Sequence, residues 1–192
     1  MQTVTSYDTA DSQYWTSCHA VNQVKYAYDS WGNLAVESQA HDGVVTTSTP
    51  SVQYVYDDGA GTTGVAKYVR LTDVIYPNTP NARDVQYGYG TTDAIDDIMS
   101  RLKTIGDTSG TLAEYKYLGL GQIVEEANPA AKLTYLTGNN VTGLDRFGRV
   151  VDQIWENYDA TPTVFDHHLS APISPDSPLK LGHPLRYNPS WS

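Results

Sequence analysis

A pair of tyrosines separated by one residue recurs four times along this chain at a nearly constant interval. The triplets are Tyr26-Ala27-Tyr28, Tyr54-Val55-Tyr56, Tyr87-Gly88-Tyr89 and Tyr115-Lys116-Tyr117. Their second tyrosines are 28, 33 and 28 residues apart, and a regular period of about 20–50 residues is the mark of a repeat array. Because residues i and i+2 of a strand point to the same face, each triplet predicts a strand with two rings on one side.

The residues after the triplets are typical of hairpin turns. Tyr28-Asp29 leads to Gly32-Asn33-Leu34, Tyr56-Asp57 to Asp58-Gly59, and Tyr117 to Gly119-Leu120-Gly121-Gln122-Ile123. Aspartate supports the local hydrogen bonds of a turn, and glycine supplies the positive φ that a tight return needs. Further turns are expected at His41-Asp42-Gly43 and Asp107-Thr108-Ser109-Gly110. Each repeat is therefore predicted to be a pair of strands joined by glycine-containing turns.

The aromatic composition favours the same fold class. The chain has 15 Tyr, 2 Phe and 4 Trp. Tyrosine suits a strand with one face on a core and a hydroxyl that reaches water. We therefore expect an all-β protein in which antiparallel hairpin repeats form a curved sheet. One segment departs from this pattern, since Ile95, Ile98, Met99, Leu102 and Ile105 have helical spacing, and we expect a helical turn near 93–98 and a strand from about 100.

The recurring Tyr-x-Tyr-Asp…Gly-Asn-Leu unit resembles the YD (RHS) repeat of bacterial proteins. The run Leu144-Asp145-Arg146-Phe147-Gly148-Arg149-Val150, with leucine in place of the second tyrosine, adds a fifth unit. The third unit departs from the pattern because Gly90 follows Tyr89 where aspartate is expected. The resemblance covers about residues 20 to 155.

The resemblance implies a structural role. In that family the hairpins join side by side into a hollow β-shell that encloses a C-terminal toxin or effector, and related surface proteins use the shell for cell contact. It implies a segment of a longer protein that is secreted or at the cell surface, with further repeats, an enclosed toxin domain or a surface glycan as partners. Members of the family cleave themselves in a core segment beyond the repeats. No matching motif occurs here, so no catalytic residue is carried over and the chain is not expected to be an enzyme.

Three regions are expected along the chain. Residues 1–19 are interpreted as a partial repeat or irregular lead-in, and 20–155 as the repeat region. Residues 156–192 are interpreted as a Pro-rich, unstructured tail, because residues 160–192 hold six of the ten prolines and proline removes the hydrogen-bond donors of a sheet. A run of four or five repeats is expected to leave an unpaired edge at each end, and to aggregate or remain partly open when expressed alone.

Charge and cysteine content argue against several classes of partner. The formal charge is −10, with 12 Lys and Arg scattered among 22 acids, so a nucleic-acid partner and an anionic membrane surface are not expected. No apolar run is long enough for a membrane span, and the first residues lack the basic and apolar segments of a signal peptide. Cys18 is the only cysteine and is interpreted as a small, partly buried side chain.

No catalytic, cofactor-binding or metal-binding residue is predicted from the sequence. The acidic pairs Asp57-Asp58, Asp96-Asp97 and Glu125-Glu126 are interpreted as turn and surface charges, because neighbours on a strand point to opposite faces. The histidines are interpreted as surface residues, including the pair His167-His168 beside Asp166.

Two other functions remain open. Aromatic faces can stack on sugar rings, so a carbohydrate-binding surface module is one alternative, although packing between tyrosines is favoured. Its candidate stacking residues are Tyr26, Tyr28, Tyr54, Tyr56, Tyr87, Tyr89, Tyr115 and Tyr117. The other alternative is a glycoside hydrolase-like enzyme, which needs two carboxylates about 5–10 Å apart in a cleft.

Overall fold

The fold was established from a computed structural model, which describes residues 1–8, 19–59, 68, 70–77, 83–157 and 163–169. Twelve strands form one antiparallel sheet in which neighbours in sequence are neighbours in space. They are β1 (Gln2–Tyr7), β2 (Ala20–Tyr28), β3 (Leu34–Ala40), β4 (Ser51–Tyr56), β5 (Leu71–Ile75), β6 (Asp84–Gly88), β7 (Thr104–Asp107), β8 (Gly110–Leu118), β9 (Gln122–Ala127), β10 (Ala131–Thr134), β13 (Asp152–Asn157) and β14 (Val164–Leu169).

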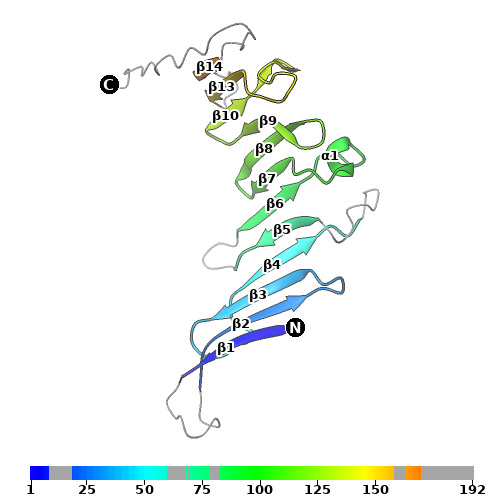
Figure 1. Ribbon diagram of the computed structural model, residues 1–192. Helices are drawn as coiled ribbons and strands as arrows, with labels where there is room; N and C mark the ends of the chain where they lie inside the picture. The colour runs from blue at the N-terminus through cyan, green and yellow to red at the C-terminus, as the bar shows by residue number, and fades with distance from the viewer. Residues whose placement is uncertain (9–18, 60–67, 69, 78–82, 158–162, 170–192) are drawn as a thin grey trace, which may run out of the picture.

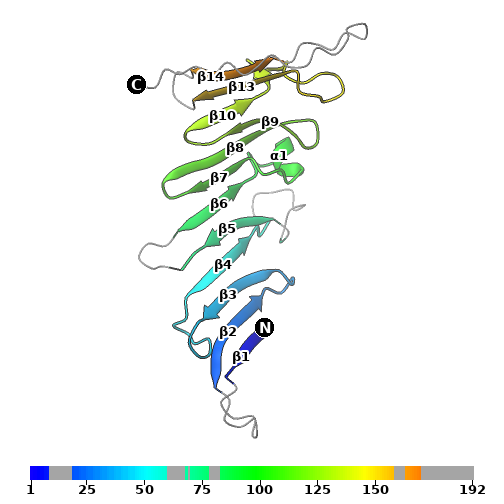
Figure 2. The same cartoon turned by 60° about the vertical axis from the view of Figure 1, so that its left-hand side comes forward.

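The sheet is a single twisted layer. Figures 1 and 2 show its strands stacked one above another from β1 to β14. The other described elements are the short pair β11 (Leu136–Thr137) and β12 (Asn140–Val141) and the one-turn helix α1 (Ile95–Ile98). They lie at an edge of the sheet, so they do not form a second layer over it (Figure 1). The prediction of an all-β fold built from antiparallel hairpins is confirmed.

The strand register shows that the tyrosine triplets share one face of the sheet. Directly paired residues of antiparallel strands point to the same side. Tyr26 pairs with Glu37, and Glu37 pairs with Val52, which precedes Tyr54 by two residues. The row of partners then continues through Val74, Val85, Tyr87, Ile105, Ala113 and on to Tyr115. We call this side the tyrosine face.

The opposite face of the sheet is more polar. It carries a row of charged side chains across four neighbouring strands, from Lys116 on β8 through Glu125 and Lys132 to Glu156 on β13. Lys116 Nζ lies 2.6 Å from Glu125 Oε1, and Lys132 Nζ lies 2.5 Å from Glu156 Oε1. Thr134 Oγ1 donates a 3.1 Å hydrogen bond to Glu125, which is buried. These four charged side chains are therefore paired with one another within the sheet.

All five connections that follow the triplet strands and β10 lie on the same side of the sheet, at the ends of its strands. They join β2 to β3, β4 to β5, β6 to β7, β8 to β9 and β10 to β13, and we call this side the turn edge. It is marked in Figures 1 and 2 by α1. Each triplet strand runs toward this edge because one strand, running the opposite way, lies between it and the next triplet strand. One repeat period therefore corresponds to two antiparallel strands, the triplet strand and the strand that follows it.

The same irregularity of register occurs in three of the four triplet strands. It falls between the middle residue and the second tyrosine, at Ala27/Tyr28, Val55/Tyr56 and Lys116/Tyr117. In each case the following strand contains one extra residue, and such a bulge increases the local right-handed twist. A recurring bulge therefore gives each repeat a similar contribution to the twist of the sheet.

The structure refines the predicted regions. Helix α1 lies within the segment 93–98, but β7 begins at Thr104 rather than near residue 100, because Ser100 has a φ of 51° and directs the chain out of the helix. Strand β1 pairs with β2, so part of the segment 1–19 belongs to the sheet.

The segment 156–192, which was expected to be unstructured, contains β14. This strand pairs with β13 through Gln153 and His168, among others. It lies between Pro162 and Pro172, so no proline interrupts its ladder. Residues 170–192, with most of the prolines of the predicted tail, lie outside the described residues.

Candidate functional site

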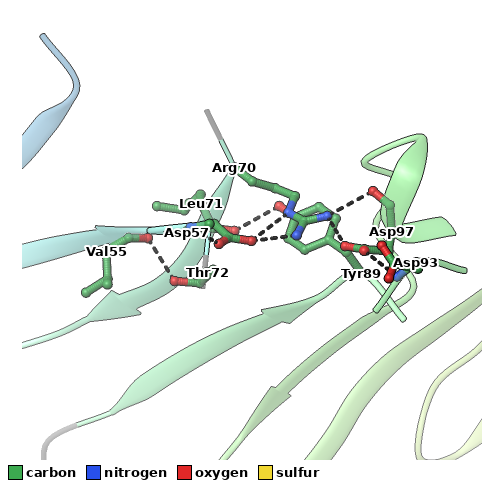
Figure 3. Close-up of polar contacts among 9 residues, drawn as sticks. Val55, Asp57, Arg70, Leu71, Thr72, Tyr89, Asp93 and Asp97 are labelled. Carbon is green, nitrogen blue, oxygen red and sulfur yellow. Dashed lines mark hydrogen bonds and ion pairs between the residues drawn. The ribbon is translucent and has the colours of Figure 1, made fainter. Parts of the chain in front are cut away.

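Arg70 is the centre of a buried ionic site of the described residues. It directly precedes β5, and only 6 % of its surface is exposed. Its guanidinium lies between two carboxylates, with Nη2 at 2.5 Å from Asp57 Oδ2 and Nη1 at 2.7 Å from Asp97 Oδ1 (Figure 3). It also lies over the ring of Tyr89, 4.5 Å from the ring centre. We call these four residues the Arg70 cluster.

The cluster joins two consecutive connections at the turn edge. Asp57 follows β4, Asp97 belongs to α1 in the β6–β7 connection, and Arg70 Nη1 also donates to the backbone carbonyl of Asp97 at 3.1 Å. Asp97 Oδ2 accepts a 2.8 Å hydrogen bond from the amide of Asp93, which has a φ of 62°. One guanidinium thus holds the short helix against the preceding repeat.

The electrostatics of the cluster favour the charged forms of Arg70 and Asp97. The pKa of Asp97 is lowered by the hydrogen bond from the Asp93 amide and by the hydrogen bond and charge of Arg70. Burial lowers the pKa of Arg70, but the hydrogen bonds and charges of Asp57 and Asp97 outweigh it, so the pKa is raised. A general acid needs a raised carboxyl pKa. The pKa of Asp97 is lowered instead, which suits a structural ion pair.

Arg101 repeats this arrangement one repeat later. It forms an ion pair with Asp96, with Nε 2.8 Å from Oδ1, and its guanidinium lies 4.7 Å from the ring centre of Tyr117. Arg101 also donates to the backbone carbonyl of Gly119 at the turn edge. Arg70 and Arg101 therefore each pair with aspartate and cover the second tyrosine of the following triplet.

The hydroxyls of Tyr89 and Tyr117 also make equivalent hydrogen bonds in the two sites. Tyr89 donates to the carbonyl of Leu71 at 2.8 Å, and Tyr117 donates to the carbonyl of Leu102 at 2.5 Å. In both cases the acceptor is the residue directly after the arginine. The recurrence of the Arg-Leu dipeptide at 70–71 and 101–102 is the sequence signal for this site, and it lies outside the Tyr-x-Tyr pattern.

Asp29 and Asp145 organise turns of the same type at the turn edge. Asp29 Oδ1 accepts from the amides of Trp31 and Asn33 at 2.8 and 2.9 Å. Asp145 Oδ1 accepts from the amides of Phe147 and Arg149 at 2.8 and 3.0 Å. In both turns the backbone amide of the aspartate donates to the carbonyl four residues later, at 2.9 Å. The two hairpins have the geometry of a turn followed by a positive-φ glycine.

The side chain four residues after each of these aspartates donates a hydrogen bond back to the aspartate carboxylate. Asn33 Nδ2 donates to Asp29 Oδ2 at 3.0 Å and to the carbonyl of Tyr68 at 2.7 Å, and Arg149 Nε donates to Asp145 Oδ2 at 2.6 Å. Burial raises the pKa of Asp29, but hydrogen bonds from Asn33 and the turn amides outweigh it and lower the pKa. The first YD aspartate is therefore a turn residue, as the sequence predicted.

The eight tyrosines proposed as stacking residues divide by what their hydroxyls contact. Tyr89 and Tyr117 bind backbone carbonyls and have one ring face covered by an arginine. Tyr54 donates to Glu37 at 3.5 Å, and burial and Glu37 raise its pKa. Tyr28 is 44 % exposed and donates to Gln2 at 3.4 Å. The remaining residues, Tyr26, Tyr56, Tyr87 and Tyr115, are half-buried on the tyrosine face.

A shallow hollow of about 470 Å³ lies between β5 and β8. Gly88 and Gly106 line it, and they leave the polar face without side chains at two neighbouring strands. Asp73 and Asp107 also line the hollow. Asp107 is engaged, since its Oδ2 lies 3.2 Å from Arg83 and its Oδ1 accepts from the Ser109 amide. The hollow is a surface depression, and of its two carboxylates that of Asp107 is bound by Arg83 and the Ser109 amide.

The other candidate acids and histidines do not converge. Glu125 and Glu126 point to opposite faces, as expected for neighbours on a strand, and Glu125 is bound by Lys116. His167 lies on β14, with Nε2 2.7 Å from Asp152 Oδ1. Within the described ranges, no three His, Cys, Asp or Glu side chains are grouped as metal ligands. Cys18 lies outside the described residues.

Neither a protein-family model nor a curated protein matches this chain. In the part of the chain that the structure describes, no helix is long and apolar enough to cross a bilayer.

Proposed function

We propose that this chain is a structural repeat segment of the RHS/YD type that forms part of the wall of a β-shell. The shell encloses or displays a C-terminal toxin or effector, and this segment performs no catalysis of its own. The observation that carries the proposal is the single twelve-stranded layer in which all triplet strands present their tyrosines on one face. A wall needs this form, with two large faces and a chain that adds strands in order.

The turn edge supports the proposal because the same device recurs there. Arg70 and Arg101 each tie an aspartate to the second tyrosine of the next repeat. In a repeat protein, stability comes from interfaces between neighbouring units rather than from one central core. Among the described residues, four apolar side chains are buried, namely Ala40, Val74, Val124 and Ala127. Contacts between repeats are therefore suited to replace a core.

The two faces suggest how a wall would be oriented. The tyrosine face is the more apolar one, and the opposite face carries the ion-paired row from Lys116 to Glu156. Burying apolar surface is favourable, whereas paired charges are compatible with water. We propose that the tyrosine face lines the interior.

The acidic residues fit a non-catalytic role. Asp57 and Asp97 are both bound by Arg70, and Asp145 is bound by Arg149. Glycoside hydrolysis needs a protonated carboxyl opposite a second carboxylate. The pKa values of Asp97 and Asp145 are lowered, by hydrogen bonds from the amides of Asp93 and Arg149 respectively before other causes. These groups are suited to hold turns rather than to donate protons.

Electron microscopy of the native gene product, purified from its source, tests the proposal. We expect a hollow β-walled particle in which this sheet is continuous with further strands. Hydroxyl-radical labelling of the intact particle should modify Tyr26, Tyr87 and Tyr115 less than in the isolated chain. A compact particle without an interior, or equal labelling of the three tyrosines in both forms, would contradict the proposal.

Carbohydrate binding is a second candidate, favoured by the uncovered ring of Tyr28, which is 44 % exposed on the tyrosine face. Glycan-array binding by the chain, lost in the Tyr28→Ala variant while its circular dichroism spectrum is unchanged, would support it. The Val44→Ala variant is the control, because Val44 is 53 % exposed in a connection between strands. No binding to any glycan by the intact chain would exclude this candidate.

A further inference from the structure

The outer edge of β1 lacks the usual protection of an edge strand. β1 is the first strand of the sheet, and of the described residues none pairs with its outer side. Natural edge strands carry charges or proline that prevent pairing with another chain. β1 has the sequence Gln-Thr-Val-Thr-Ser-Tyr, without a charged residue or proline. Its backbone donors and acceptors are therefore open to a further strand.

The last strand differs in this respect. β14 contains Asp166, His167 and His168 among its six residues. Pairing two copies of β14 would bring these polar groups together. The outer edge of β1 is therefore the better surface for self-association.

The register of β1 fits a second copy of itself about a two-fold axis perpendicular to the sheet. Such an axis preserves the faces, so residues of equal parity must lie opposite each other. With Val4 opposite Val4 of the second copy, Gln2 lies opposite Ser6 and Thr3 opposite Thr5. This register uses the five residues from Gln2 to Ser6, before the shift between Ser6 and Tyr7.

The side chains on the tyrosine face match in this register. Val4 pairs with Val24 of β2 and is 59 % exposed. Placing two copies of Val4 side by side completes a row of four valines, Val24–Val4–Val4–Val24, across the junction. Cross-strand pairs of β-branched residues stabilise antiparallel sheets, and the row removes exposed apolar surface from water.

The opposite face also matches. Thr5 Oγ1 accepts a 2.8 Å hydrogen bond from Gln23 Nε2, and Thr3 pairs with Lys25. The proposed register gives two Thr3–Thr5 pairs, and it places each Lys25 in a row with Gln23 of the other copy instead of with the second Lys25. No like charges meet directly across the junction.

We propose that two copies of this chain associate through their β1 strands, antiparallel and with Val4 opposite Val4. The product is a continuous sheet of both copies with one uninterrupted tyrosine face. This inference goes beyond the proposed function, because it concerns the edge of the sheet in the chain expressed alone; in a wall that is continuous with further strands, the outer edge of β1 would pair with a preceding strand instead. A junction of one short strand pair is small, so the dimer is expected to be weak, with a Kd in about the micromolar range.

Disulfide cross-linking tests both the partner and the register. In a Cys18→Ser background, Val4→Cys places two cysteines opposite each other at about 4.5–5.5 Å between Cα atoms, within the range of a disulfide. Thr3→Cys is the matched control, because two copies of position 3 lie diagonally at about 7–8 Å and cannot be bridged without movement. We expect a covalent dimer from Val4→Cys at least tenfold in excess over that from Thr3→Cys.

Two outcomes of the cross-linking would overturn the proposal. One is equal cross-linking of both variants, which would mean random contact. The other is no cross-linking of Val4→Cys while the chain sediments as an oligomer, which would mean pairing through another edge. Analytical ultracentrifugation gives an independent measure: Val4→Lys should shift the chain to monomer, and His168→Lys on β14 should leave the dimer unchanged. A persistent dimer of Val4→Lys would also contradict the proposal.

Discussion

The hydroxyl of Tyr89 donates a 2.8 Å hydrogen bond to the backbone carbonyl of Leu71, the residue that follows Arg70. Tyr117 makes the equivalent bond to Leu102, after Arg101. These bonds connect the end of one triplet to Leu71 at the start of β5 and to Leu102 just before β7, in the preceding repeat. Their recurrence makes the second tyrosine a link between repeats as well as a packing residue.

Removing either hydroxyl should weaken the sheet. Tyr89→Phe and Tyr117→Phe are each expected to lower the free energy of unfolding by about 1 kcal/mol, because each leaves a part-buried carbonyl without its partner. Urea denaturation followed by circular dichroism measures the change. Tyr28→Phe is the control, since its bond to Gln2 is 3.4 Å long and exposed, and it should change stability little. Equal effects of all three variants would contradict the assigned role.

Loss of the Arg70 guanidinium should have a larger effect. Arg70→Leu leaves Asp57 and Asp97 without their shared cation, and breaking a buried ion pair in this way costs about 3 kcal/mol. Arg83→Leu is the matched control, because Arg83 also pairs with an aspartate but its side chain is 57 % exposed. Its loss should cost less than about 1 kcal/mol in the same denaturation experiment. A similar cost for both variants would mean that the Arg70 cluster does not hold the repeats together.

Stability should fall at acid pH through the turn aspartates. The folded pKa values of Asp29, Asp97 and Asp145 lie below the ordinary value of 3.8, since hydrogen bonds from nearby amides and side chains favour the charged form. Their contribution is therefore complete above that pH and is lost as the pH falls through the folded values. Urea denaturation between pH 2 and pH 7 measures this loss. Asp97→Asn should flatten the dependence, and an unchanged slope would exclude Asp97 as a contributor.

The positive-φ glycines of the two equivalent turns should resist substitution. Gly32 and Gly148 have φ values of 89° and 76°, which L-residues rarely adopt. Gly32→Ala and Gly148→Ala are each expected to destabilise the chain by about 1 kcal/mol. Gly121→Ala is the control, because Gly121 has no positive φ and its added Cβ would meet no atom within 4 Å. Thermal melting of the three variants compares them directly.

The strand pattern was predictable because its causes are local. The i, i+2 spacing of Tyr54 and Tyr56 fixes their common face, and the sequence Asp29 to Asn33 fixes a hairpin by its own hydrogen bonds. The helical spacing around Ile95 likewise indicated α1. These features depend on residues only a few positions apart.

The Arg70 cluster was not predicted because its causes are distant in sequence. Arg70 and Asp97 are brought together only after β5 and β6 have paired, and Arg70 is separated from Tyr89 by the same two strands. A single arginine before a strand does not reveal which carboxylate it will reach. Strand β14 was not predicted because the segment around it is rich in proline. The six residues of β14 contain no proline, and they pair with β13.

The return of every triplet strand toward the same side has a consequence for how such a gene can change. A duplication that adds one two-stranded unit, or a deletion that removes one, leaves the tyrosine rings of all other units on the tyrosine face. An event that adds a lone strand would reverse the direction of every later segment and move its turns to the other border. Recombination within this architecture is therefore tolerated in steps of two strands, and the near-constant intervals of 28, 33 and 28 residues are the length of one such step.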